Sequence, residues 1–230
     1  MALLGKAAMI LSFDIVAEAI DEHDDWHSHE HFNERMSIPG FLRGSRWVAS
    51  AAEPNYFVMY EVADLDVLAS AAYLERLNHP SPWTTKMMAN YRGMRRGLCH
   101  LSASHGDGLG NVGLLIRFSP QDANESLLRD WLCGDVLPTL PARPGLVSAH
   151  LFETALDPEL TQEQRIRGKD GAIDWVLLVT GYRAQSLARL AEGELSTAQL
   201  EQRGAAGVSA GRYTMMHSLS AQEAATKNPA

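Results

Sequence analysis

The sequence has few cysteines, no excess of basic residues and no long apolar run. Its two cysteines, Cys99 and Cys133, lack the spacing of a metal site, so we expect buried free thiols and a cytoplasmic location. The formal net charge of -8 disfavours a nucleic-acid or anionic-membrane surface. No apolar run approaches the roughly 20 residues of a membrane span, and residues 1–16 lack the cleavage-site pattern of a secretory signal. We therefore expect neither a membrane partner nor a nucleic-acid partner.

Several nucleotide-binding and catalytic motifs are also missing. The sequence contains no GxGxxG loop, no Walker-A loop, no GxSxG nucleophile elbow and no CxxC pair. Chemistry that uses a nicotinamide, a nucleoside triphosphate or a nucleophilic serine is therefore disfavoured. A small molecule is the expected partner.

The sequence contains an internal repeat. Trp26 stands thirteen residues before Pro39, and Trp131 stands thirteen residues before Pro144, each proline followed by glycine. Strands and helices alternate in the same order on both sides of a glycine-rich linker at 102–111. The expected strands are 9–16, 41–49, 56–62 and 94–102, then 112–118, 147–154, 175–182 and 212–219; the expected helices are 21–37 and 64–77, with a short helical piece after 83, then 124–140 and 186–203.

This order predicts an α+β fold of two ferredoxin-like βαββαβ repeats, with both helices of each repeat on one face of an antiparallel sheet. The stretches 56–60 and 175–179 are apolar at both alternating positions, so both faces of each sheet should be covered. Helices cover one face, and the other sheet is the economical cover for the second. We expect an intrachain α/β barrel, with residues 1–104 as the active half and 105–230 as the structural half.

Two runs resemble the W…EH…R…PGF…RY pattern of dimeric α/β barrel proteins related to the EthD group, Trp26–Arg35 (WHSHEHFNER) and Ile38–Trp47 (IPGFLRGSRW). The stretch 77–84 (LNHPSPWT) is similar to a proline-tryptophan segment in members of that group. The second half keeps Trp131, the acid Asp135 and the Pro-Gly turn, but has Val136 where the pattern has histidine. The resemblance implies a tandem form of this barrel. It does not single out a reaction, because the superfamily includes isomerases, cofactor-free monooxygenases, polyketide cyclases and haem enzymes.

The two halves differ on one face of the first helix. At the fixed offset, four ionisable residues of the first half correspond to four apolar residues of the second: His23, His27, His31 and Arg35 to Leu128, Leu132, Val136 and Leu140. If both helices dock alike, titratable groups face an apolar sheet, where they must pair or line a cavity. Burial would then shift their pKa values, as in acid-base sites. A rotated or displaced helix would instead leave the stripe in solvent.

The lead hypothesis is a cofactor-independent small-molecule enzyme of lyase, isomerase, cyclase or oxygenase type. Its substrate would be apolar, for instance aromatic or polyketide-like. His31 is the expected base or acid, with His27, Glu30 or Glu34 orienting it and Arg46 holding an oxyanion. The expected substrate-binding residues are Trp26, Arg35, Tyr60, His79, Trp83 and His100.

Three alternatives stay open. The chain could be a non-catalytic, ligand-sequestering or stress-responsive barrel. A divalent metal could be held by His27 and His31 with His23 or Glu34, although no HExxH motif is present. Haem could bind through one of three further histidines, His100, His150 or His217. A homodimer through other surfaces is also open, since a tandem barrel supplies its own sheet partner.

Overall fold

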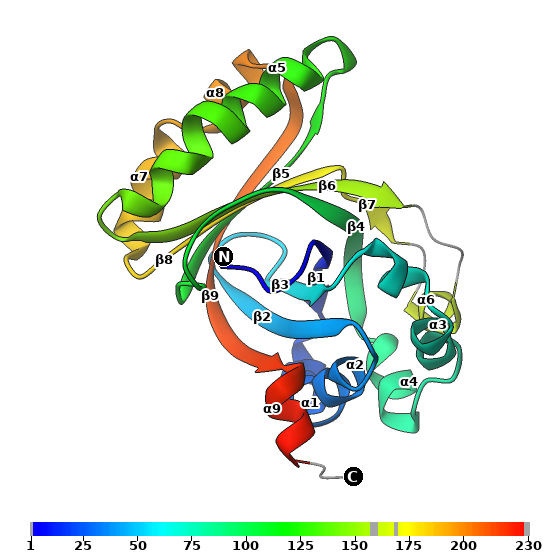
Figure 1. Cartoon of the computed structure of the whole chain (residues 1–230). Coiled ribbons are helices and arrows are strands. Elements are labelled where there is room, and N and C mark those ends of the chain that lie inside the picture. The colour runs from blue at the N-terminus through cyan, green and yellow to red at the C-terminus, as the bar shows by residue number, and fades with distance from the viewer. Residues whose placement is uncertain (1, 157–160, 168–169, 228–230) are drawn as a thin grey trace.

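The computed structural model describes residues 2–156, 161–167 and 170–227, and its centre is a closed antiparallel barrel (Figure 1). Strands follow one another around the ring in the order β1-β3-β2-β9-β5-β8-β6-β4, and β4 pairs again with β1. The short β7 pairs with β4 in parallel, at Arg95 and Arg96, just beyond the end of the β4–β6 pairing. The strand bounds are β1 Ala7–Ile15, β2 Phe41–Ala51, β3 Tyr56–Val62, β4 Tyr91–Gly106, β5 Val112–Pro120, β6 Leu146–Leu156, β7 Gly171–Ala172, β8 Trp175–Gly181 and β9 Ala205–Ser220.

Two long strands close the barrel within one chain. β9 pairs with β2, placing His217 opposite Arg46, and β4 pairs with β6, placing Leu101 opposite Phe152. The strands of residues 7–106 pair in the order β4-β1-β3-β2, and those of residues 112–220 in the order β9-β5-β8-β6. Closure therefore needs no second copy of the chain.

Strand lengths differ from the sequence-based expectation at these two junctions. Residues 102–106, expected to begin a linker, continue β4, so the boundary between the expected halves at 104 falls inside a strand. β9 begins at Ala205 rather than at 212. Both strands are longer because β4 and β9 pair with the opposite half of the barrel, which local apolar patterning does not report.

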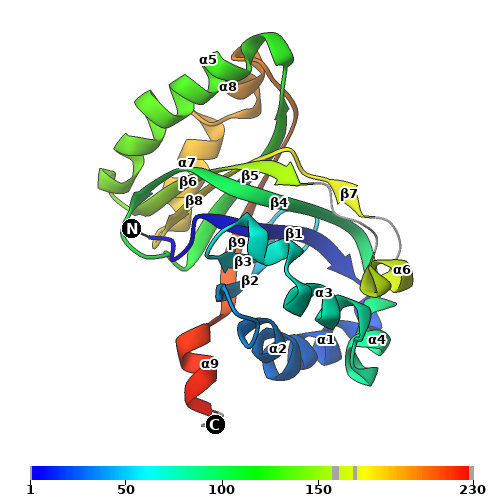
Figure 2. The same ribbon diagram turned by 45° about the vertical axis from the view of Figure 1, so that its right-hand side comes forward.

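Helices lie on two outer faces of the barrel, as Figures 1 and 2 show. One face carries α1, α2, α3 and α4 of the first half, together with α6. The other carries α5, α7 and α8, and α9 follows β9 at the C-terminal end. The bounds are α1 Ile20–Trp26, α2 Phe32–Met36, α3 Ala71–Asn78, α4 Pro82–Met88, α5 Glu125–Asp130, α6 Gln162–Arg167, α7 Ala184–Glu192, α8 Thr197–Gln202 and α9 Ala221–Lys227.

Strand alternation divides the apolar side chains among three layers. On β3, Tyr56, Val58 and Tyr60 face the first-half helices, whereas Phe57 and Met59 face the barrel interior. A third cluster fills the space between the second-half helices and the sheet. Both faces of the sheet are therefore covered, as the apolar strands predicted.

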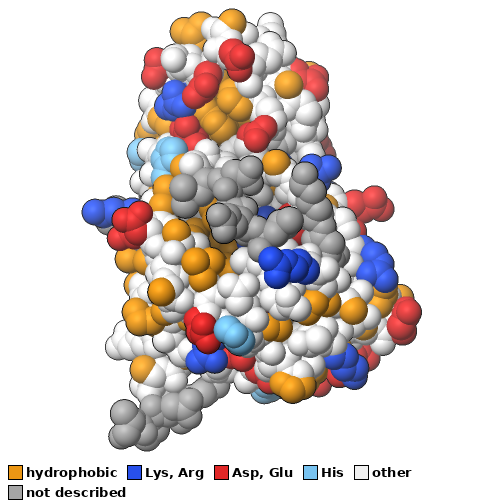
Figure 3. Space-filling view, turned by 90° about the vertical axis from the view of Figure 1, so that its right-hand side faces the viewer, with side chains coloured by type: hydrophobic (Ala, Val, Ile, Leu, Met, Phe, Trp, Pro, Cys, Tyr) orange, Lys and Arg blue, Asp and Glu red, His pale blue; other side chains and the backbone are white. Residues whose placement is uncertain are grey.

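The segment between β6 and β8 holds two elements that the sequence did not reveal, α6 and β7. α6 leaves the second half and packs against α3 and α4 of the first. Figure 3 shows this side of the molecule, where acidic and basic side chains are interspersed among apolar ones. No helix in the described part of the chain is long and apolar enough to cross a membrane.

Candidate functional site

The site is built on the first long helical segment, residues 20–36. Its middle turn, His27–His31, is π-helical, and α1 and α2 flank it. The corresponding segment of the second half has a π-helical turn at Trp131–Val136. Such turns insert an extra residue into an α-helix and are frequent at functional sites.

The polar stripe of this segment faces inward. His23, His27, His31 and Arg35 are all buried, with between 0% and 5% of their surfaces exposed. Their second-half counterparts are equally buried, namely Leu128, Leu132, Val136 and Leu140. The two segments therefore dock alike on their sheets, and imidazoles occupy the places where the other half has leucine or valine.

His27 and Tyr60 form the centre of the cluster. The Nε2 atom of His27 lies 3.2 Å from the phenol oxygen of Tyr60. Burial, with smaller contributions from the neighbouring charges of His31 and His23, holds the pKa of His27 well below its ordinary 6.5. Burial also raises the pKa of Tyr60 well above its ordinary value. At neutral pH this is a neutral imidazole joined to a neutral phenol.

His31 lies one turn further along, between an indole and a carboxylate. Its ring centroid is 4.4 Å from that of Trp26 and 5.4 Å from that of His27. Its Nδ1 atom is 3.8 Å from a carboxylate oxygen of Glu34. Burial raises the pKa of Glu34, so this carboxylate takes up a proton more readily than one in water.

His23 extends the cluster toward the helix start. Its Nδ1 atom lies 3.0 Å from Asp24 and its Nε2 atom 3.2 Å from the phenol oxygen of Tyr91. Burial lowers the pKa of His23, and Asp24 offsets this in part. Three histidines thus line up along the helix, and His23 and His27 each contact a tyrosine of the sheet.

A small cavity lies beside this cluster, between the helix, the sheet and α6. It offers about 20 Å³ to water, enough for about one molecule. Three methionines contribute to its wall, and their unbranched side chains adapt easily to a change of shape. The lining comprises Met9, Leu11, His27, His31, Arg35, Tyr60, Tyr73, Leu77, Met88, Tyr91, Met94, Arg96, Thr161 and Glu163.

Arg35 closes one side of the cavity with a residue from the second half. Its Nη2 atom donates to both carboxylate oxygens of Glu163, at 2.7 and 2.8 Å, and both side chains are buried. The guanidinium carbon also lies 5.6 Å from the centre of the Tyr73 ring. Burial alone would lower the pKa of Arg35, but the Glu163 carboxylate outweighs it and the pKa is raised. Among the described residues, Nε and Nη1 have no hydrogen-bond partner.

Glu30 and Trp26, both expected at the site, join the helix to α4. A carboxylate oxygen of Glu30 accepts hydrogen bonds from Ser81 at 2.6 Å, from Trp26 at 3.2 Å and from Thr84 at 3.4 Å. The indole of Trp26 is fully buried and also donates to Thr84. Glu30 therefore stands between α1 and α4, and the carboxylate near His31 is Glu34.

Arg46, expected as an oxyanion partner, is held away from the cavity. Its guanidinium donates to the backbone oxygen of Asp24 at 3.0 Å and to the Ser28 hydroxyl at 3.1 Å. A carboxylate oxygen of Asp24 lies 3.5 Å away. These bonds fasten β2 to the helix, and the cavity lining does not include Arg46.

Three further predicted residues lie outside the cavity lining. The indole of Trp83 donates to Glu22 at 3.2 Å on the outer side of α1. His79 pairs with Glu75 at 3.0 Å and is 71% exposed. His100 is exposed on β4, opposite Ala7. Of the ten predicted site residues, four line the cavity: His27, His31, Arg35 and Tyr60.

Sequence reasoning missed several residues that line the cavity. Glu163 and Thr161 come from the second half, and no local sequence pattern indicates them; Glu163 is 128 residues from its partner Arg35. Arg96 pairs with Asp170 at 3.3 Å, again across the halves. Tyr73 lies within the predicted helix 64–77 and Tyr91 just before the predicted strand 94–102, so both could have been found from the sequence.

The described residues offer no grouped metal ligands, and the cavity beside the histidines is small. Among residues 2–156, 161–167 and 170–227, no three His, Cys, Asp or Glu side chains are grouped to hold a metal ion. The cavity offers about 20 Å³ to water, so haem, like any other small molecule, would need an enlarged cavity there. His150 lies inside the barrel, its ring nitrogens 3.0 Å from Ser104 and from Ser148.

Comparison with known proteins identifies the fold. No family model matches the sequence, and no curated protein matches it. An anthrone oxidase-like protein is 10% identical, covering 97% of each chain at a TM-score of 0.67. A proposed monooxygenase from Fusobacterium nucleatum is 8% identical, covering 95% of this chain and 96% of that one at 0.61. A chlorite dismutase from Candidatus Nitrospira defluvii, in complex with imidazole, is 10% identical, covering 96% and 94% at 0.55. At these identities the likeness is one of fold, a ferredoxin-like α/β barrel over the whole chain.

Proposed function

We propose that this protein is a small-molecule enzyme whose reaction begins with proton transfer in the cavity between the first helix and the sheet. The observation that carries the proposal is the buried His27–Tyr60 pair beside His31, on a face where the other half of the chain holds leucine. Buried polar groups cost stability unless they are paired. Their placement in a cavity, with a shifted histidine pKa, is the usual signature of acid-base chemistry.

His31 is the proposed proton acceptor, with Glu34 as its orienting carboxylate. His27 lies next to it as a neutral imidazole held by Tyr60, and one of its ring nitrogens, Nδ1, has no hydrogen-bond partner among the described residues. A neutral ring can accept a proton or donate one, according to its tautomer. A substrate proton taken up by His31 therefore finds a second nitrogen base one turn away.

Arg35 is the proposed partner for negative charge on the substrate, in place of Arg46. Two of its guanidinium nitrogens, Nε and Nη1, have no hydrogen-bond partner among the described residues, and the side chain lines the cavity. When a proton leaves the substrate, charge develops on an oxygen, and a buried guanidinium stabilises it strongly. Arg46 is already committed to Asp24 and Ser28.

The cavity must enlarge before a substrate can enter. Pockets for small molecules usually measure about 300–1,000 Å³, whereas this one admits about one water molecule. We infer that α6 moves outward with Thr161 and Glu163, so that the Arg35–Glu163 contact opens and the methionine side chains rearrange. Arg35 then faces the substrate instead of Glu163.

Among the reaction types, the oxygenase type is favoured by the fold likeness to proteins described as an anthrone oxidase-like protein and a monooxygenase. An apolar, tricyclic aromatic ketone with an acidic CH₂ group suits proton abstraction by histidine. The resulting anion reacts with dioxygen, so that one CH₂ group and O₂ give one C=O group and H₂O. Dioxygen is the oxidant, and the protein supplies the base and the oxyanion partner.

Anthrone and hydroxylated anthrones test this proposal directly. We expect oxygen uptake and quinone formation above the uncatalysed rate. His31→Ala should lower kcat by about 10²–10⁴-fold, the usual contribution of a positioned acid or base, while Tm stays nearly unchanged. The measurements are oxygen consumption, product mass and thermal unfolding.

His29→Ala is the matched control, because His29 lies on the same turn but is exposed. It should retain full activity. Equal loss in both variants would mean that the helix tolerates neither change. Turnover that persists in His31→Ala would contradict the proposal. Binding without turnover in the native protein would favour the ligand-sequestering alternative instead.

We also propose that the barrel consists of two ferredoxin-like repeats. The equal strand orders of residues 7–106 and 112–220, and the π-helical turn in both long helices, support two ferredoxin-like repeats related to the EthD group. On this reading residues 1–104 form the active half and 105–230 the structural half; their outermost residues, 1 and 228–230, lie outside the described part. Association of two chains through other surfaces is testable by sedimentation.

A further inference from the structure

A second pocket opens at one end of the barrel, away from the cavity described above. It offers about 470 Å³ to water and is ringed by the ends of strands β1, β3, β4, β5, β8 and β9. Successive residues of a strand face opposite sides. β4 therefore sends Met94 and Arg96 to the first cavity and Arg95 to this mouth. The two pockets share no residue.

Arg117 is the deepest charged group of the mouth. Its Nη2 atom donates to the hydroxyl of Ser209 at 3.0 Å, directly across from it on β9. Its Nη1 atom is buried and has no hydrogen-bond partner among the described residues. Burial lowers the pKa of this guanidinium, and the nearby positive charge of Arg95 lowers it further. A buried charged donor without a partner costs stability.

The opposite wall presents a second positive charge. Arg95 pairs with Ser12 across β4 and β1, so both residues lie on the inner face of the barrel. Arg95 lines the mouth, whereas Ser12, although buried, is not part of the lining. Two arginines therefore lie on the walls of one pocket, with guanidinium donors available to an oxyanion.

Carboxylates occupy the rim. Asp14 accepts the backbone N–H of Asn55 at 2.7 Å, and Asp174 accepts the hydroxyl of Ser119. Glu53 is exposed at the edge. The groups that act on the charge of Arg117 are Tyr213 and Arg95, and no rim carboxylate is among them. Arg117 is therefore the partly buried positive charge of the mouth, whereas Arg95, Glu53 and Asp174 are exposed.

Apolar side chains complete the lining. Ile173 is buried and belongs to the interior cluster, and Pro54 and Ala172 lie nearer the edge. A ligand for this mouth has an anionic end for the arginines and an apolar body for these side chains. The rim carboxylates repel a phosphate, which carries about two negative charges near neutral pH, more strongly than they repel a singly charged carboxylate.

We propose that the barrel mouth is a binding site for a small organic monocarboxylate with an apolar body, its carboxylate held by Arg117 and Arg95. Charge-assisted bonds from a guanidinium to a carboxylate are among the strongest polar contacts in proteins. The site does not depend on the chemistry proposed for the helix cavity.

Benzoate is the probe, titrated into the full-length protein by calorimetry, with neutral benzamide as its isostere and inorganic phosphate as the second oxyanion. We expect saturable benzoate binding, no binding of benzamide and weaker binding of phosphate. Arg117→Met should weaken benzoate binding about tenfold or more. Arg95→Met, which changes an exposed side chain and should fold normally, should weaken it by a smaller factor.

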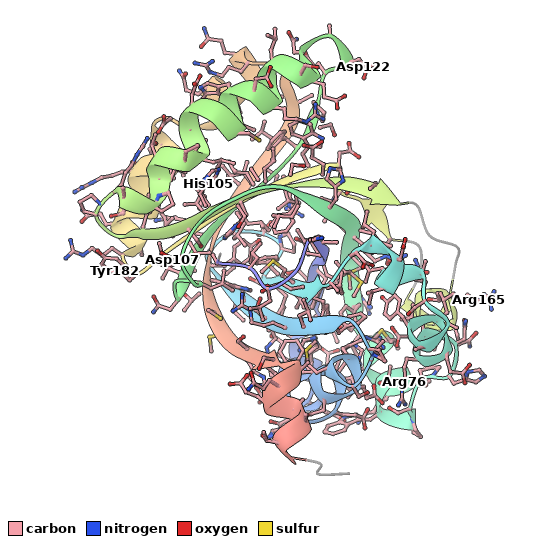
Figure 4. All side chains as sticks on the ribbon, in the orientation of Figure 1. Arg76, His105, Asp107, Asp122, Arg165 and Tyr182 are labelled. Carbon is pink, nitrogen blue, oxygen red and sulfur yellow. The ribbon has the colours of Figure 1, made fainter. Side chains whose placement is uncertain are left out.

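Arg183→Met is the matched control for the loss of one positive charge. Arg183 is exposed and stacks on Tyr182 at the far end of β8, the end opposite the mouth (Figure 4). This variant should bind benzoate as the native protein does. The proposal is overturned if benzoate fails to bind at millimolar concentration, if Arg117→Met and Arg95→Met both bind it normally, or if phosphate binds more tightly than benzoate.

Discussion

The inner faces of the two long helical segments, residues 20–36 and 125–142, carry opposite chemistry on the same frame. Both cross the outer face of a four-stranded part of the barrel, both contain a π-helical turn, and both bury the same four positions. One buries three histidines and an arginine, and the other buries leucines and a valine. The difference shows that fold stability does not require polar groups there, because the second segment docks without them.

The helix face of the second half contributes only apolar packing. Leu128, Leu132 and Leu140 join a continuous apolar cluster with the strands beneath. In the first half the same space holds ring contacts, one ion pair and a cavity. Burying imidazoles and a guanidinium costs free energy that leucine would not. That this cost is present on one face only supports the proposal that the first-half face is a functional site.

A histidine introduced into the buried helix face of the second half should cause the largest loss of stability. Leu132→His loses the burial of a leucine, about 1.5–3 kcal/mol, and leaves ring nitrogens unpaired at about 1–3 kcal/mol more. We expect the free energy of unfolding to fall by about 2.5–6 kcal/mol. Urea unfolding followed by far-UV circular dichroism measures it.

Leu127→His is the control for that change, because Leu127 is 69% exposed on the same helix. Its effect should stay within about 0.5 kcal/mol. If Leu132→His proved as mild as Leu127→His, the second face would tolerate polar groups freely. The contrast between the two halves would then lose its meaning.

Replacing Arg35 by leucine, the residue at the same position of the second half, should destabilise the protein slightly less. Arg35→Leu, the counterpart of Leu140, leaves the Glu163 carboxylate buried without its partner, which typically costs about 3–5 kcal/mol. The double variant Arg35→Leu/Glu163→Leu should recover most of that loss, since paired apolar residues often replace a buried ion pair without penalty. Thermal and urea unfolding of the three proteins test this. An equally unstable double variant would show that the pair is not the cause.

The inward-facing stripe of the helix could be predicted from the sequence. The ion pair between Arg35 and Glu163, which closes one side of the cavity, could not. β3 was predicted at its observed bounds, and the stripe His23–Arg35 was predicted to point inward, because strand and helix periodicity are local signals. The partner of Arg35 lies 128 residues away on a short helix between β6 and β8, so no periodicity links the two. Arg46 looked suitable from its type, yet backbone and hydroxyl acceptors from the helix hold it elsewhere.

Replacing the imidazole of His27 should have the smallest effect on stability, and this effect should depend on pH. Burial holds the pKa of His27 well below the 6.5 of the unfolded chain. Below that pH the unfolded chain binds a proton that the folded protein does not, so stability falls as the pH falls, by about 1.4 kcal/mol per pH unit for each such histidine. His27→Leu, the counterpart of Leu132, should flatten the stability curve by that amount between about pH 6.5 and pH 5.

Two other buried histidines also make stability fall at acid pH, and both remain in the variant. Burial lowers the pKa of His150 to about 3 and also lowers the pKa of His23. The acid slope should therefore decrease but not vanish. Urea unfolding of His27→Leu and of the native protein at a series of pH values measures this difference in slope. An unchanged slope in His27→Leu would mean that this imidazole takes up its proton inside the folded protein, and the neutral pair with Tyr60 would no longer describe the site.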